Sequence, residues 1–294
     1  MTDSFLTQVV LPLALALIMF GMGLSLTKQD FIELGKEPKA ILVGLLGQLL
    51  LLPILAYGVA ILFRLDQHLA IGMMIVAACP GGTSSNIISQ LARANLALSV
   101  SLTAVTTLVC VLTTPLIIQF AINQFDTHSD NSFSLLGTTL GLIFVTLLPV
   151  LFGIYLRQKY PEKAINSEPF FRRLAVGFLI FIIIALVYQE RETIFGSFSQ
   201  VLLPSITLNL VAIATGLLIG FVFNLIGRDC VTLGIEVGVQ NSGMAILIGV
   251  SFLERPDYAI TAAVYGLSMY LGAGLLIWGA KWHSKKLKEV SVTP

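Results

Sequence analysis

Nine apolar segments, each long enough to cross a bilayer as a helix, constrain this chain more than any other feature. They run approximately over residues 5–27, 38–63, 69–94, 96–123, 134–157, 170–189, 199–226, 230–253 and 258–281. Leu, Ile, Val, Ala and Phe fill these segments without strand-like alternation, so helices are favoured over a barrel. Charged residues make up only 11% of the chain, whereas a soluble domain carries about 25%. The sequence therefore predicts an all-α polytopic membrane protein with nine transmembrane helices, forming one unit over residues 1–294.

The basic residues indicate how this unit is oriented. If all nine segments cross the membrane, one side carries all 17 Lys and Arg residues except Arg64, Arg191 and Arg255. Acidic residues do not divide in this way. Because basic connections stay in the cytoplasm, we predict an external N-terminus, a cytoplasmic surface element at 28–39 and a cytoplasmic tail at 282–294. The first segment lacks a basic leader and a clear cleavage site, so we expect a retained helix.

Glu236 is the only charged residue in the interior of any apolar segment. A carboxylate at the bilayer centre costs about 2.5–3.5 kcal/mol on insertion scales. The Lys and Arg residues of the other segments lie near the segment ends, so none is at mid-depth to offset that cost. We therefore expect a proton or a bound cation to be the partner of Glu236.

Two segments contain a polar interruption. The third has the run CPGGTSSN at 79–86, in which Pro80 removes a backbone donor and clashes with the preceding turn. Eleven residues separate Leu69 from Pro80, about 16 Å of helix, or half of a ~30 Å hydrocarbon core. The eighth has EVGVQNSG at 236–243, without proline, so the sequence leaves open whether this helix unwinds.

The two interrupted segments occupy corresponding positions in two halves of the chain. They lie five segments apart, so adding five maps segments one to four onto six to nine, and the odd offset reverses their direction. This pattern predicts an inverted-topology repeat, with four helices in 5–123, five in 134–281, and the fifth segment unpaired. Paired interruptions are a strong sequence indicator of a transporter site, where freed carbonyls bind Na⁺ and half-helix N-termini favour anions.

Four motifs carry a family resemblance. They are IMFGMGLS at 18–25, CPGGTSSN at 79–86, ALSVSLT at 97–103 and EVGVQNSG at 236–243. In order and spacing the chain resembles the bile acid:sodium symporter family, and in particular its bacterial members with nine helices. The resemblance implies a core domain plus a panel domain, two crossed discontinuous helices in the core, and a location in the bacterial inner (cytoplasmic) membrane.

The resemblance also implies the site residues. By motif position, the first of two expected Na⁺ sites would use Ser85, Asn86, Ser99, Thr103 and Glu236. The second would use Gln48, Glu236, Gln240 and the backbone carbonyls of Val237 and Val239. The organic anion would meet the crossing near Thr83, Asn86 and Asn241. The chemistry agrees, because hard cations take oxygen ligands and Ser99 and Thr103 share one helix face.

The predicted function is a sodium-coupled secondary active symporter that takes up an organic anion by alternating access. Two Na⁺ against one carboxylate leave a charge of +1, which favours a monovalent carboxylate. Several relatives that transport bile acids carry Trp-His-Asn in the last helix, where this chain has SMYLG at 268–272. The substrate is therefore expected to be bile-acid-like or smaller.

Two other functions remain as alternatives. A sodium/proton antiporter can share the crossed-helix architecture, but such proteins usually place two acids, or an acid and a Lys, at the crossing. An intramembrane enzyme would need paired carboxylates or clustered histidines, whereas His68, His128 and His283 fall in connections or the tail. We therefore expect no enzymatic activity. The net charge of +1 gives no reason to expect nucleic acid binding.

Overall fold

The computed structural model describes residues 6–290 apart from 28, 31, 33–34, 36, 127–133 and 190. Several residues of the predicted surface element at 28–39, His128, and the tail residues 291–294 lie outside this described part. Within it every regular element is helical, and the only strand-like feature is an isolated antiparallel bridge between Gly81 and Gln240. The all-α prediction is therefore confirmed.

The helices follow one another with short connections. The α-helices are α2 (Leu11–Ser25), α4 (Pro38–Leu46), α5 (Leu52–Leu62), α6 (Gln67–Ala78), α7 (Thr83–Leu91), α8 (Leu96–Phe125), α9 (Leu135–Leu142), α10 (Leu148–Lys159), α11 (Pro161–Gln189), α12 (Arg191–Val222), α13 (Gly227–Gly238), α14 (Ser242–Leu247) and α15 (Ala259–Val290). Single π-helical turns join some of them, namely η1 (Leu6–Val10), η2 (Gly47–Leu51), η3 (Ile143–Leu147) and η4 (Ile248–Phe252). The 3₁₀ turn η5 (Pro256–Tyr258) precedes α15.

Six helical segments of the described chain are long and apolar enough to cross a membrane. They are Gln8–Ser25, Pro38–Leu62, Leu96–Phe125, Leu135–Lys159, Phe198–Val222 and Pro256–Ala280. Two of the other three expected segments are the interrupted ones, and the third, 170–189, lies within α11. The count of nine crossings therefore stays a prediction. Helix α11 begins nine residues before the predicted segment, and α15 continues as helix into the predicted tail, to Val290.

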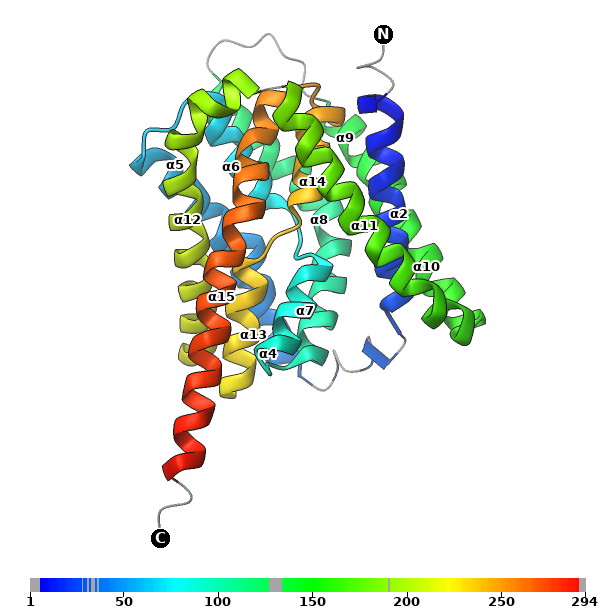
Figure 1. Ribbon diagram of the computed structural model, residues 1–294, viewed down its shortest axis with the longest axis vertical. Coiled ribbons are helices and arrows are strands. Elements are labelled where there is room, and N and C mark those ends of the chain that lie inside the picture. The colour runs from blue at the N-terminus through cyan, green and yellow to red at the C-terminus, as the bar shows by residue number, and fades with distance from the viewer. Residues whose placement is uncertain are drawn as a thin grey trace.

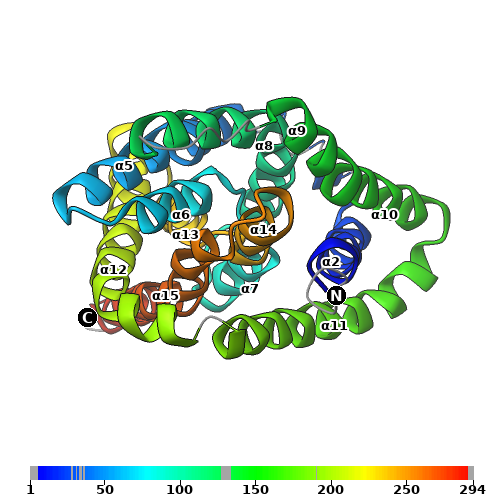
Figure 2. The same cartoon turned by 90° about the horizontal axis from the view of Figure 1, so that it is seen from above.

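The helices form two groups that are visible from above (Figure 2). Helices α2, α10 and α11 gather on one side, and α6, α7, α13 and α14 lie in the other group, flanked by α5, α8, α12 and α15. The first described helix starts at one end of the molecule and α15 ends at the other (Figure 1). Buried side chains such as Met19, Met73 and Tyr265 connect the helices in one apolar core.

Both interrupted segments are broken in the structure. Helix α6 ends at Ala78 before Pro80, and α7 starts at Thr83. Helix α13 ends at Gly238 and α14 starts at Ser242, although no proline is present. The second break depends on local and tertiary partners. The Asn241 side chain accepts a hydrogen bond from Met244 N at 3.0 Å and so caps α14, while Asn241 N donates to Pro80 O at 2.9 Å.

Glycines allow close packing in the group formed by α2, α10 and α11. A Cβ added to Gly23 on α2 would lie 2.3 Å from Val150 O and 3.0 Å from the Cα of Gly153 on α10. Small residues allow membrane helices to approach each other this closely.

We expect Gly23→Ala to lower the free energy of unfolding by about 1–3 kcal/mol, the usual cost of overpacking. Thermal unfolding of the purified protein in detergent measures the change. Gly177→Ala, where an added Cβ meets nothing within 4 Å, is the control, and equal stability of the two variants would contradict this account.

Candidate ion and substrate site

The two breaks meet at about mid-height in the molecule (Figure 1). Gly81 and Gln240 form the antiparallel bridge, and Asn241 N donates to Pro80 O. The carboxyl ends of α6 and α13 and the amino ends of α7 and α14 are therefore brought to one place. Carbonyl ends favour cations and amide ends favour anions, so the meeting point can serve ions of both signs.

Glu236 lies on the last turns of α13 and is fully buried. Its Oε1 accepts a hydrogen bond from Ser99 Oγ at 2.5 Å, and its Oε2 accepts one from Thr103 Oγ1 at 2.8 Å. Both donors lie on α8, one helical turn apart. No Lys, Arg or His of the described residues forms an ion pair with Glu236; the ion pair found in that part of the chain joins Arg255 and Asp257. Among the described residues, the side chains that donate hydrogen bonds to this buried carboxylate are therefore neutral hydroxyls.

The structure brings together all five residues expected at the first Na⁺ site. Ser85 Oγ lies 3.4 Å from Thr103 Oγ1, and Ser99 Oγ lies 2.9 Å from Asn86 Oδ1. Ser99 therefore contacts two acceptor oxygens, Asn86 Oδ1 and Glu236 Oε1, but a hydroxyl has one proton to donate. In this arrangement the Ser99 hydroxyl can donate to only one of the two oxygens at a time, and a cation bound between them would satisfy the other.

The residues expected at the second Na⁺ site also lie together. Gln48 Nε2 donates to Glu236 O at 3.2 Å, and Gln240 Nε2 donates to Glu236 O at 3.0 Å and to Val237 O at 2.9 Å. Both side chains are buried, and the amide oxygens Gln48 Oε1 and Gln240 Oε1 have no hydrogen-bond partner. Val239 is fully buried in the break. Two unpartnered oxygens beside two helix-end carbonyls form an oxygen-rich set.

Gly81 lies between the two oxygen sets. A Cβ added there would lie 2.8 Å from Glu236 Oε2, 3.2 Å from Gln48 Nε2 and 3.4 Å from Thr103 Oγ1. These three atoms come from α13, η2 and α8, so they face a single point from different elements. Only glycine leaves that point free of protein atoms, because any other residue would fill it.

A cavity of about 360 Å³ adjoins the meeting point. Thr83 and Asn241, both expected to contact the substrate, line it together with Ser84, Gln240 and Ser242. The remaining lining is mostly apolar and comes from α2, α7, α14 and α15, including Ile18, Met22, Ile87, Ile246, Met269, Tyr270 and Ile277. Asn86, the third expected substrate residue, is not among the lining residues, and its amide oxygen accepts a hydrogen bond from Ser99 instead.

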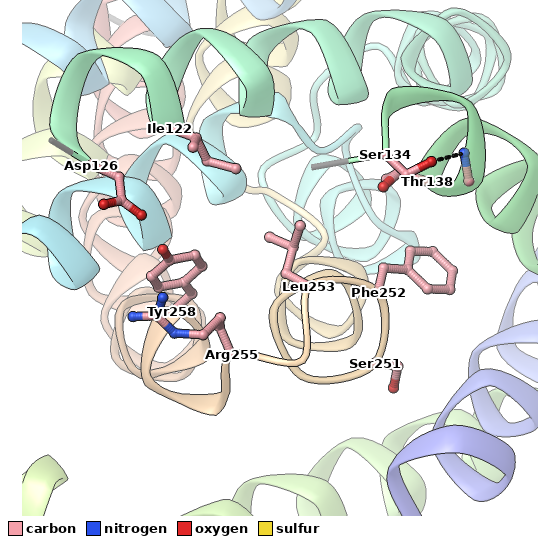
Figure 3. A pocket seen from close by; sticks show the side chains of 10 residues that line it. Ile122, Asp126, Ser134, Thr138, Ser251, Phe252, Leu253, Arg255 and Tyr258 are labelled. Atoms are coloured by element: carbon pink, nitrogen blue, oxygen red, sulfur yellow. Dashed lines mark hydrogen bonds between the residues drawn. The ribbon is translucent and has the colours of Figure 1, made fainter. Parts of the chain in front are cut away.

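A second cavity, also of about 360 Å³, lies at the end of the molecule where α8 ends and α9 begins. Arg255, Asp126 and Tyr258 lie on one side of it, and Ser134 and Thr138 on the other (Figure 3). Arg255 pairs with Asp257 at 2.7 Å, which raises the pKa of the Arg255 guanidinium, and packs over the Tyr258 ring. No local sequence pattern indicates this cavity, because its walls come from segments that are distant in the chain.

The structure adds polar residues that the sequence interpretation missed. Ser89, one turn after Ser85 on α7, is fully buried and donates to Ser99 Oγ at 3.1 Å. Asn209 of α12 and Tyr265 of α15 donate to Gly238 O at the second break. Asn209 could have been recognised as an amide within the apolar segment 199–226, whereas Gln48 was assigned through the family resemblance. Tyr265 offered no such signal, since tyrosines are common in such segments.

Comparison with known proteins decides the family. The family model of the sodium bile acid symporter family matches residues 12–197. The chain belongs to the sodium bile acid symporter family. A longer similarity is found with the uncharacterized sodium-dependent transporter YocS of Bacillus subtilis, which is 31% identical over 286 residues, covering 94% of this chain and 83% of YocS.

Other members of the symporter family are similar along most of this chain. The probable sodium/metabolite cotransporter BASS1 of Arabidopsis thaliana chloroplasts is 34% identical over 85% of this chain. The chain spans 61% of that plant protein's length. The sodium-dependent organic anion transporter of Bos taurus is 29% identical over 96% of this chain and 75% of its own length. These relatives are named as sodium-dependent transporters or cotransporters, and none is named as an enzyme or an antiporter.

Proposed function

We propose that this chain is a sodium-coupled symporter that carries an organic anion by alternating access, in a bacterial inner membrane with an external N-terminus and a cytoplasmic C-terminus. The observation that carries the proposal is the oxygen-lined carboxylate of Glu236, buried without a basic partner where two broken helices meet beside an apolar cavity. Membership of a family of sodium-dependent transporters supports it. For the antiporter alternative, the other buried acid among the described residues is Asp229, which lies about two turns from Glu236 in the first turn of α13 and accepts a hydrogen bond from Asn95 Nδ2 at 2.9 Å.

The first Na⁺, as co-transported substrate, would bind in the cluster around Glu236, Ser99 and Thr103. A cation there offsets the cost of a carboxylate taken out of water. It also relieves the proton shortage at Ser99, whose hydroxyl faces two acceptors. Ser85 and Asn86 add neutral oxygens from α7, so the ion would join α7, α8 and α13.

The second Na⁺ would bind between Gln48, Gln240 and the end of α13. Without a cation, the two amide nitrogens satisfy Glu236 O and Val237 O, and the amide oxygens are left buried and unpartnered. Rotating each amide by half a turn would direct its oxygen toward these carbonyls, giving a donor set of the kind that hard cations prefer. The residues present therefore fit a second ion.

The proposed substrate is a monovalent carboxylate with an apolar body. Two Na⁺ and one carboxylate leave one positive charge at the crossing, and the amino ends of α7 and α14 favour an anion there. The polar residues Thr83, Asn241 and Ser242 lie at that end of the cavity, while the rest of its lining is mostly apolar. A volume of about 360 Å³ is near the lower limit for ligand pockets, about 300–1,000 Å³, which favours a molecule smaller than a conjugated bile acid.

Alternating access requires that the cavity be closed on one side. The lining residues run from the crossing along α7 to Leu91 and along α15 to Ile277, toward the end at which α15 terminates. At the opposite end, the Phe252 ring packs against Gly141 of α9, where an added Cβ would meet ring atoms at 3.0–3.3 Å. We propose that α2, α9, α10 and α11 form the panel, that the other helices form the core with its inverted repeat, and that this contact opens when they move apart.

Thermal stabilisation of the purified protein tests the proposal. We expect organic monocarboxylates to raise the melting temperature in NaCl but not in KCl, because a ligand that prefers the folded state stabilises it by mass action. At about a hundred times its Kd, such a ligand contributes about 2.7 kcal/mol. The matching neutral amide of each acid is the control. Equal stabilisation in both salts, or proton release on adding Na⁺ without any organic substrate, would contradict symport and favour the antiporter.

A further inference from the structure

The carbonyl of Gly238, the last residue of α13, has two side-chain partners from other helices. Asn209 Nδ2 of α12 donates to it at 2.7 Å, and the Tyr265 hydroxyl of α15 donates at 2.8 Å. In an unbroken helix this carbonyl would accept from Ser242 N, which instead donates to Gln240 O. Two buried neutral donors therefore replace one lost helical hydrogen bond.

The side chains of both donors, Asn209 and Tyr265, are buried. Asn209 is 1% exposed and Tyr265 is fully buried. An unpaired amide or hydroxyl in such surroundings is costly, so each contact is needed by the donor as well as by the carbonyl. A Cβ added to Gly272 of α15 would lie 2.1 Å from Asn209 Oδ1, and one added to Gly238 would lie 2.4 Å from Ile213 Cγ1. Glycine at both positions allows the amide to reach the carbonyl.

The carbonyls next to Gly238 belong to the proposed second ion set. Glu236 O and Val237 O accept from Gln48 and Gln240, whereas Gly238 O accepts from α12 and α15. Holding Gly238 O fixes the plane of the peptide that leads into Val239. The same peptide is also held at its nitrogen, because Val239 N donates to Ile235 O at 2.8 Å, so the point from which Val239 and Gln240 continue into the second set is fixed.

We infer that Asn209 and Tyr265 are positioning residues for the second sodium set: they hold the end of α13 unwound, so that the ion finds its carbonyls already arranged. The inference rests on the proposed function. Binding to a prearranged site avoids the cost of ordering the segment. Loss of the arrangement should therefore weaken sodium binding, even though neither residue contacts the ion.

Tyr265→Phe removes one donor and keeps the ring, and Gly272→Ala displaces the Asn209 amide without deleting a donor. For each purified full-length variant, the melting temperature is measured against NaCl concentration, with choline chloride keeping ionic strength constant. We expect both variants to need about three to ten times more sodium for half-maximal stabilisation, the effect of roughly one hydrogen bond. Tyr57→Phe on α5, outside the crossing, is the matched control and should keep the wild-type midpoint.

The outcomes separate this inference from the proposed function. A purely structural role would lower the melting temperature equally in choline and sodium and leave the sodium midpoint unchanged, which would overturn the inference while symport stands. A wild-type protein that does not respond to sodium at all would overturn the proposed function and this inference together. If Tyr265→Phe does not fold, Gly272→Ala alone gives the answer, because an alanine there displaces the Asn209 amide and the end of the Ile213 side chain but deletes no donor.

Discussion

Replacing Glu236 with Gln is expected to abolish sodium-dependent uptake. The substitution keeps the shape of the side chain and removes its charge. The other buried acid of the described residues, Asp229, lies in the first turn of α13, about two turns away. Removing one partner of a buried charge pair costs about 3–5 kcal/mol, which corresponds to a loss of about a hundredfold or more in sodium affinity. Uptake of a radiolabelled carboxylate into proteoliposomes with an inward sodium gradient measures the effect.

Ser99→Ala should have a smaller effect on sodium affinity than Glu236→Gln. It removes one neutral hydroxyl at 2.5 Å from Glu236 Oε1 and keeps the charge. The expected loss of sodium affinity is about tenfold, the lower end of the range of about 1.5–3 kcal/mol for hydrogen bonds to charged groups, because Thr103 still donates to Glu236 Oε2. Sodium-dependent uptake that survives Glu236→Gln at the wild-type rate would refute the mechanism, because no other described acid lies in the crossing to replace it.

Gly81→Ala is expected to have the second largest effect. The new methyl group would lie 2.8 Å from Glu236 Oε2 and 3.2 Å from Gln48 Nε2, between the two oxygen sets. Neither Glu236 nor Gln48 can withdraw without losing its buried partners. We expect sodium-dependent stabilisation and uptake to fall by at least about tenfold, consistent with an overpacking cost of about 1–3 kcal/mol. Sodium titration of the melting temperature, together with proteoliposome uptake, measures both.

The matched control for this change is Gly58→Ala on α5. Gly58 lies on an exposed helix face, and an added Cβ meets nothing within 4 Å. It should behave as the wild type in both assays, which removes the general effect of a Gly-to-Ala change from the comparison. A Gly81→Ala protein with normal sodium affinity would show that the point facing Glu236, Gln48 and Thr103 is not part of the ion path.

Much of the candidate site could be predicted from sequence because its residues are chemically out of place. Glu236, Gln48 and the polar runs at 79–86 and 236–243 stand in apolar surroundings where each polar group needs a partner. The helical period alone places Ser99 and Thr103 on one face. Their grouping around Glu236 required the motif resemblance in addition, because no local pattern shows which helices pack together.

The predicted segment boundaries differ from the observed helix ends where the prediction used apolar character alone. Helix α11 continues upstream through a polar stretch to Pro161, and α15 continues to Val290, because helix formation in those stretches does not depend on a hydrophobic environment. The number of crossings and the repeat stay predictions, since length and composition mark six segments and the interrupted ones are too short to be recognised by that criterion.

By itself, the sequence determined that this chain is a helical membrane protein with one acid in the interior of an apolar segment and two polar interruptions, because hydrocarbon leaves so few ways to satisfy a charge or a broken backbone. Only the tertiary structure decided that the second break unwinds without proline and that Asn209 and Tyr265 hold its last carbonyl. It alone also decided that Asn86 faces Ser99 and not the cavity. Those outcomes depend on hydrogen bonds between helices that lie far apart in the chain, and no local sequence pattern contains them.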